Sequence, residues 1–174
     1  WGFILWTPWT TLADVRANVE AARARRFARE GWWLVSALLV LRATPLSSLA
    51  RHDGDLLAPT YGDPAIAHAL SWALEDVHAS QPWRFRDARA ADVFALIARA
   101  FAARKGGAHA DCFAGDPLYA AVAARLPSSS ASLLALAEAL VARAGAEPAP
   151  KDRLALLGDA LAGAVPDRRQ ASAG

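Results

Sequence analysis

The sequence predicts an α/β unit at the N-terminus, followed by a mainly α-helical C-terminal region. The first apolar run, residues 3–6, has the aromatic and β-branched side chains of a buried strand. A second apolar run ends before Pro45, and a helical pattern lies between the two runs. The later apolar residues are mostly alanine and leucine, which favour helices. A strand, a crossover helix and a second buried strand form a βαβ unit, in which the strands pair in parallel.

The first helix begins at a recognisable cap. Pro8 cannot continue a β-ladder, and Thr11 with Asp14 three residues later is typical of a capping box. Apolar residues then recur at helical spacing, with arginine and glutamate largely between them. Gly31 is suited to a left-handed C-cap, so the pattern predicts a helix of about five turns.

The run at residues 32–41 is apolar throughout, which leaves a buried strand and a buried helix both open. We place a buried strand at residues 37–42, because Pro45 ends the run. Residues 32–36 are then a helical or irregular lead-in to that strand.

The rest of the chain carries repeated helix-start signals. Asp63-Pro64 and Asp116-Pro117 each combine an N-cap with a proline in the first turn, and Asp87 and residues 128–130 supply further caps. We expect the helix from Asp63 to run to about residue 79, the one from Asp87 to 104 and the one from residues 128–130 to 141. The helix after Asp116 is expected to be short, and a weak last helix is expected at residues 154–161. The predicted organisation is an α/β unit at 1–58, a helical region at 59–146, and a weakly ordered helix and tail at 147–174.

Composition limits the classes of function. The 174 residues carry 19 basic and 17 acidic side chains, a net charge of +2, which gives little support for binding nucleic acid through phosphates. The longest apolar run is well short of the roughly 20 residues of a membrane-spanning helix. The single Cys112 excludes an internal disulfide and fits a reducing cytoplasm. We therefore expect a cytoplasmic protein that binds neither nucleic acid nor membrane.

No residue pattern indicates catalysis by this chain itself. The four histidines, His52, His68, His78 and His109, have no metal-binding spacing, and Cys112 has no evident base. We predict no catalytic residues and no metal ligands.

Two stretches resemble radical S-adenosylmethionine (SAM) enzymes, especially those that carry a cobalamin-binding domain. In that family a Gly-x-Ile-x-Gly-x-x-Glu strand leads to a Thr-x-x-(Asp/Glu) helix start and a later Asn. The positions that match are Gly2, Ile4, Thr11, Asp14 and Asn18, while Trp6 stands at the second Gly and Trp9 at the Glu. Residues 41–49 are similar to the family's next strand end, with Pro45, Ser47 and Leu49 in agreement.

The resemblance implies the last βαβ unit of a partial TIM-like barrel in a C-terminal fragment of such an enzyme. The parent would cleave SAM reductively at a [4Fe–4S] cluster, and possible cobalamin use would add methylation of a small-molecule or peptide substrate. The cluster's cysteine motif is absent here, so the fragment alone is expected to be inactive and to need the missing N-terminal part of its chain. The cofactor-binding positions carried over are Gly2, Ile4 and Trp6 on the first strand and Leu41, Arg42 and Ala43 on the second.

Two other interpretations remain open. One is a non-catalytic all-α protein-interaction module, which predicts helices rather than parallel strands in residues 1–45. The other is a scaffold helix bundle that docks a partner through Trp32, Trp33 and Trp72, which predicts an exposed apolar patch.

Overall fold

A computed structural model describes residues 4–24, 32–36, 85–126, 132–148 and 150–164. In these ranges the chain is helical, and the elements are α1 (Leu12–Ala24), the 3₁₀ turn η1 (Trp32–Val35), α4 (Ala88–Lys105), α5 (Ala108–Asp111), α6 (Pro117–Arg125), α7 (Leu133–Ala144) and α8 (Arg153–Ala164). None of the helices in the described part is long and apolar enough to cross a membrane.

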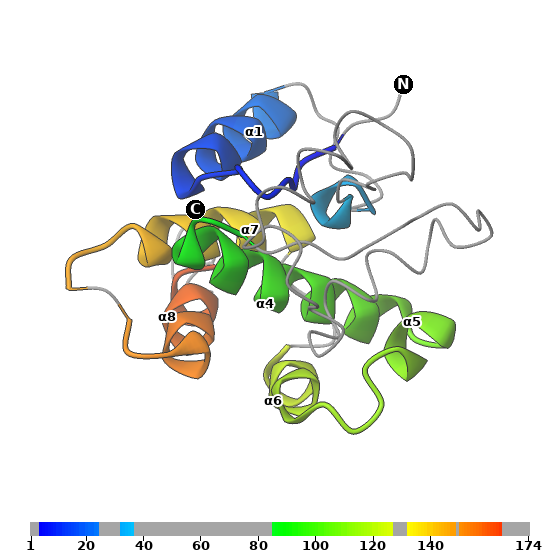
Figure 1. Ribbon diagram of the computed structural model, residues 1–174. Coiled ribbons are helices and arrows are strands. Elements are labelled where there is room, and N and C mark those ends of the chain that lie inside the picture. Colours follow the sequence, from blue (N-terminus) through cyan, green and yellow to red (C-terminus); the bar gives the residue numbers. More distant parts are fainter. Residues whose placement is uncertain (1–3, 25–31, 37–84, 127–131, 149, 165–174) are drawn as a thin grey trace, which may run out of the picture.

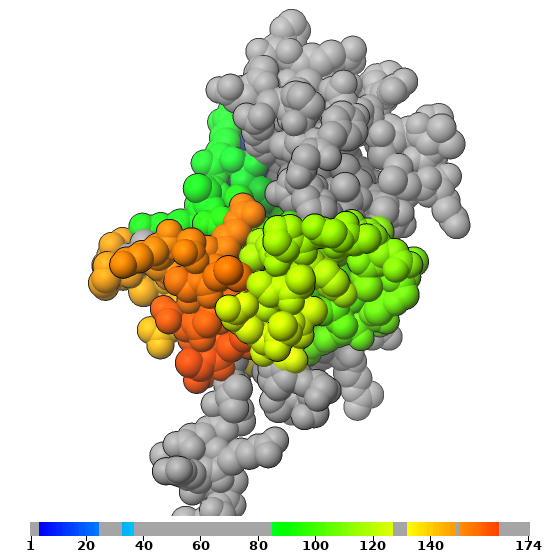
Figure 2. Space-filling view, turned by 90° about the horizontal axis from the view of Figure 1, so that it is seen from below, coloured from blue at the N-terminus to red at the C-terminus, as the bar shows by residue number. Residues whose placement is uncertain are grey.

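Helix α4 is the centre of the packing. Its 18 residues include a continuous buried stretch from Val93 to Ala102, and it contacts all the other elements. Helix α7 packs between α1 and α8 (Figure 1). On the opposite side, α6 and α8 lie next to each other on one face of the molecule (Figure 2). Helices buried on several sides in this way derive their stability from packing rather than from intrinsic propensity.

The carboxylate of Asp87 accepts hydrogen bonds from N–H groups at the start of two helices. Oδ1 of Asp87 accepts the backbone N–H groups of Arg89 (2.9 Å) and Ala90 (3.2 Å), which confirms Asp87 as the N-cap of α4. Its Oδ2 accepts the N–H of Leu12 at 2.7 Å, the first residue of α1. A contact between residues 75 positions apart therefore fixes the start of α1 against the start of α4.

The other caps agree with the sequence in most cases. Thr11 and Asp14 form the predicted capping box, with reciprocal backbone-to-side-chain bonds of 2.9 and 3.2 Å. Asp116 caps α6 as predicted, through the N–H of Leu118. The cap of α7 is Ser132 rather than residues 128–130, because the hydroxyl of Ser132 accepts the N–H of Ala135. The predicted helix over 63–79 lies outside the described residues.

The predicted α/β barrel unit is wrong. Residues 4–10 form no strand, and only Trp6 carries an isolated bridge within the described ranges. The N–H groups of Leu5 and Trp6 both donate to the single carbonyl of Ser36, and a turn follows at once, closed by Thr7 and Thr10. The segment is thus too short to build a ladder before Pro8 ends it. The proposed strand at 37–42 lies outside the described residues. Residues 32–35, for which the sequence left helical and irregular structure both open, form a 3₁₀ turn.

Candidate functional site

The structure describes two of the six predicted cofactor positions, Ile4 and Trp6. Ile4 is 49% exposed on the surface, and Trp6 is fully buried. Gly2, Leu41, Arg42 and Ala43 lie outside the described residues.

The Trp6 indole is enclosed by protein. Its Nε1–H donates to the carbonyl of Leu34 at 2.7 Å, and its ring lies 5.9 Å from Phe85 and 5.1 Å from Phe94, measured between centroids. Edge and tilted geometries of this kind are favourable between aromatic rings. The indole is therefore a core residue, and its one polar atom has a hydrogen-bond partner.

Trp33 is also part of the core, with an exposed fraction of 6%. A surface on which Trp33 docks a partner is therefore not present. Trp72 lies outside the described residues, as do His52, His68 and His78. Within the described ranges, no three His, Cys, Asp or Glu side chains come together as metal ligands.

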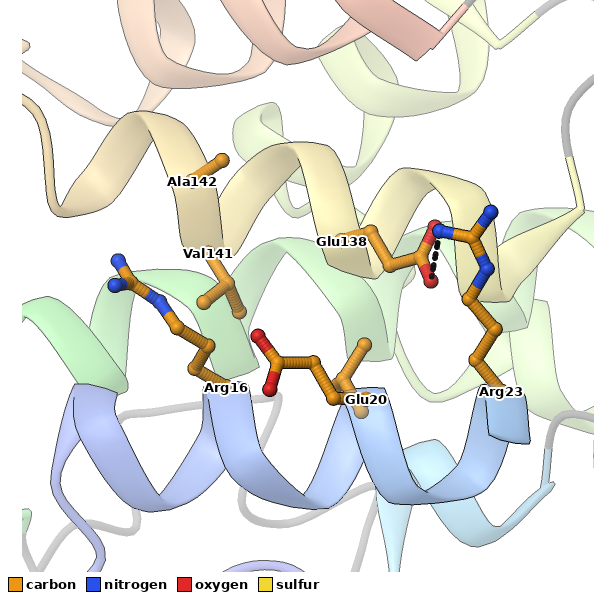
Figure 3. A pocket seen from close by; sticks show the side chains of 7 residues that line it. Arg16, Glu20, Arg23, Glu138, Val141 and Ala142 are labelled. Carbon is orange, nitrogen blue, oxygen red and sulfur yellow. Dashed lines mark hydrogen bonds and ion pairs between the residues drawn. The ribbon is translucent and has the colours of Figure 1, made fainter. Parts of the chain in front are cut away.

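A groove between α1 and α7 is the candidate site (Figure 3). It has a volume of about 420 Å³, and its lining residues are Arg16, Val19, Glu20, Arg23, Glu138, Val141 and Ala142. Val19 and Val141 form an apolar floor, each with only 2% of its surface exposed. Charged side chains from both helices stand around that floor.

The two helices run antiparallel along the groove. Arg16 of α1 lies beside Gly145, at the C-terminal end of α7. A Cβ atom added to Gly145 would be only 2.7 Å from Nη2 of Arg16. Arg23 reaches Glu138, earlier in α7, with Nη1 3.4 Å from Oε1. The guanidinium of Arg16 is thus placed near the negative end of the α7 dipole.

The charges of the groove are only partly paired. Arg23 and Glu138 form an exposed ion pair, with side-chain exposures of 74% and 30%. Arg16 and Glu20, one turn apart on α1, make no side-chain hydrogen bond or ion pair with any described residue. Figure 3 shows the guanidinium of Arg16 directed away from the carboxylate of Glu20. The groove therefore offers one positive and one negative group to a ligand.

Sequence reasoning missed this groove. The alternation of Arg16, Glu20 and Arg23 was visible as the polar face of an amphipathic helix, which is the usual role of such a pattern. Glu138 is 115 residues away from Arg23, and no local signal indicates that the two meet.

The remaining polar clusters have structural roles. Arg99 and Asp116 are paired in the core, and the thiol of Cys112 lies 3.2 Å from the carbonyl of Ala108 in its own helical turn. The ring of His109 packs edge-on against Phe101.

No family model, curated protein or solved structure matches this chain.

Proposed function

We propose that this chain is a non-catalytic, helical protein-interaction module that binds another polypeptide along the groove between α1 and α7. The observation that carries the proposal is the pair of opposite charges of Arg16 and Glu20, which have no partner among the described residues, beside the Val19–Val141 floor. An apolar strip with a charged rim is the arrangement found at protein interfaces.

The signs of the charges favour a polypeptide ligand. A groove that binds nucleic acid would present cations alone, whereas here Glu20 and Glu138 stand beside Arg16 and Arg23. A polypeptide carries both acidic and basic side chains and can satisfy both free groups at once. Complementary charge of this kind gives specificity and raises the rate of association more than it raises affinity.

The α1 side of the groove is anchored to the rest of the fold. Asp87 binds the start of α1, and one face of α1 is buried through Leu12, Val15 and Val19. A preformed surface loses less conformational entropy when it binds.

The radical SAM interpretation remains a prediction from the resemblance alone. Its fold, the βαβ unit of a partial barrel, is absent from the described residues, and Trp6 is a core residue. Binding of SAM, of a [4Fe–4S] cluster or of cobalamin by the parent likewise remains a prediction.

Photo-crosslinking in the cells that make the full-length protein tests the module. A photoreactive amino acid replaces Ala142, which is exposed in the groove, and a control variant carries it at Ala162, which is exposed on α8. We expect Ala142 alone to give an adduct with a polypeptide that mass spectrometry identifies. The adduct should be lost when Arg16→Ala and Glu20→Ala are added, and it should form again from the two purified proteins. Equal adduct yields at both positions, or no adduct at Ala142, would overturn the proposal.

A further inference from the structure

The charges along the exposed flank of α1 are complementary to themselves. Arg16 and Glu20 have opposite signs, are both exposed, and have no partner among the described residues. We infer that the polypeptide bound along the groove is a second copy of this chain, whose α1 lies antiparallel to the first, so that each Arg16 pairs with Glu20 of the other copy. This inference rests on the proposed function, since it names the partner of the same groove.

Symmetry supplies the geometric step. In a two-fold dimer both copies use the same surface. If residue i of the first copy contacts residue j of the second, then residue i of the second copy contacts residue j of the first. A two-fold axis that passes midway between Arg16 and Glu20 places Arg16 of each copy opposite Glu20 of the other copy. The two residues are separated by one turn, about 6 Å along the helix, so both ion pairs form at once.

The charges also reject the alternative orientation. Two parallel copies of α1 in register would place Arg16 opposite Arg16 and Glu20 opposite Glu20. Like charges held opposite each other are destabilising, and this repulsion selects the antiparallel pairing.

The neighbouring residues do not obstruct the pairing. With the same axis, Arg23 lies opposite Ala13 of the second copy, and Arg23 is already paired with Glu138. Ala13, Ala17 and Ala142 are all exposed and small, so a second helix can come close. The Val19–Val141 floor then lies beneath the two ion pairs.

The dimer is expected to be weak. One pair of helices covers less than the roughly 800 Å² per partner of a standard stable interface. Exposed ion pairs add little each, and salt screens them. Association should therefore be seen at high chain concentration and should weaken as the salt concentration rises.

Sedimentation equilibrium of the full chain, up to about millimolar concentration as weak interfaces require, tests the pairing. Arg16→Glu and Glu20→Arg each place like charges opposite each other, and each should weaken the dimer about tenfold or more. The double variant Arg16→Glu/Glu20→Arg restores complementarity and should regain most of the association. In an equimolar mixture of the two single variants, one carries two acidic groups and the other two basic groups. The mixture should therefore form heterodimers more readily than either variant associates with itself.

Controls separate folding from pairing. Arg125→Glu makes the same change of charge at an exposed position on α6, away from the groove, and should leave the dimer unchanged. Far-UV circular dichroism should be the same for all variants, since every mutated side chain is exposed.

The outcomes distinguish this inference from the proposed function. A wild-type chain that stays monomeric, a dimer that is insensitive to the single reversals, or a double variant that does not recover would each overturn the second copy as the partner. If Ala142 still crosslinks to a different protein, the interaction module stands without it. If no adduct forms at Ala142 in the cells, and none forms with the purified chain at about millimolar concentration, both proposals fall.

Discussion

Arg99 and Asp116 form a buried ion pair that attaches α6 to the central helix α4. Oδ2 of Asp116 lies 2.7 Å from both Nε and Nη2 of Arg99, and the two side chains are 3% and 10% exposed. The remaining groups are also satisfied, since Nη1 of Arg99 donates to the carbonyl of Ala95 and Oδ1 of Asp116 accepts the N–H of Leu118. The guanidinium also lies over the ring of Phe113, 5.2 Å from its centroid.

Removing one partner of this pair should be costly. In Asp116→Ala the Arg99 guanidinium stays buried without its counter-charge, and α6 loses its N-cap, so we expect the free energy of unfolding to fall by about 3–5 kcal/mol. Urea unfolding followed by circular dichroism measures the change. The matched control is Glu147→Ala, which breaks the exposed pair with Arg89 and should cost less than about 1 kcal/mol. Similar losses for the two variants would contradict the assigned role of the buried pair.

Asp87 should matter more than an ordinary cap, because it accepts N–H groups from two helices. A single N-cap contributes about 1 kcal/mol, so Asp87→Ala is expected to cost roughly twice as much as Ser132→Ala, which uncaps α7 alone. Urea unfolding gives both values. Hydrogen exchange should also show faster exchange of the Leu12 amide in Asp87→Ala, and an unchanged rate at Leu12 would contradict the shared cap.

The capping box of α1 gives a dependence on pH. The pKa of Asp14 is lowered from its usual value of 3.8, first by the backbone N–H of Thr11 and then by the Thr11 hydroxyl. A carboxyl with a depressed folded-state pKa contributes stability above its unfolded pKa and loses it as the pH falls through the folded value. The contribution of Asp14 is therefore complete near neutral pH and is lost below about pH 4.

Thr11→Val removes the hydroxyl but keeps the backbone N–H. The pKa of Asp14, followed by NMR of its carboxyl carbon, should rise partway toward the usual value, and the pH dependence of stability in the acid range should become shallower. Thr10→Val is the control, since the Thr10 hydroxyl contacts Thr7 and Leu5 rather than Asp14. An equal rise of the Asp14 pKa in both variants would rule out the hydroxyl as the cause.

Local signals predicted much of this fold. Asp87, Asp116 and the Thr11–Asp14 pair act on N–H groups within three residues of themselves, so the sequence alone locates those helix starts. The end of α4 at Lys105 follows from the two glycines after it. The start of α7 was misplaced by a few residues, because several serines in a row offer equivalent caps.

Long-range contacts account for the errors. Residues 4–6 have the composition of a strand, but Trp6 is buried against Phe85 and Phe94, about 80 and 90 positions away. Strand propensity reflects how well a side chain fits a half-buried surface. A core made of helices buries Leu5 and Trp6 equally well, so their composition does not require a strand. The candidate groove was missed for the same reason, since it exists only where α1 meets α7.

Replacing Trp6 separates a core role from a cofactor role. Trp6→Phe leaves the carbonyl of Leu34 without the indole N–H and leaves space where the larger ring packed against Phe85 and Phe94. A lost buried hydrogen bond costs about 1–3 kcal/mol, and the smaller ring adds to this, so the free energy of unfolding should fall by about 2–4 kcal/mol. The matched control is Trp9→Phe, the same substitution at a side chain that is 41% exposed, where we expect a change within about 0.5 kcal/mol. Urea unfolding of the chain without any added cofactor measures both. If Trp6→Phe were as stable as the wild type under these conditions, the indole would not be needed to fill the core, and a ligand-binding role for Trp6 would regain support.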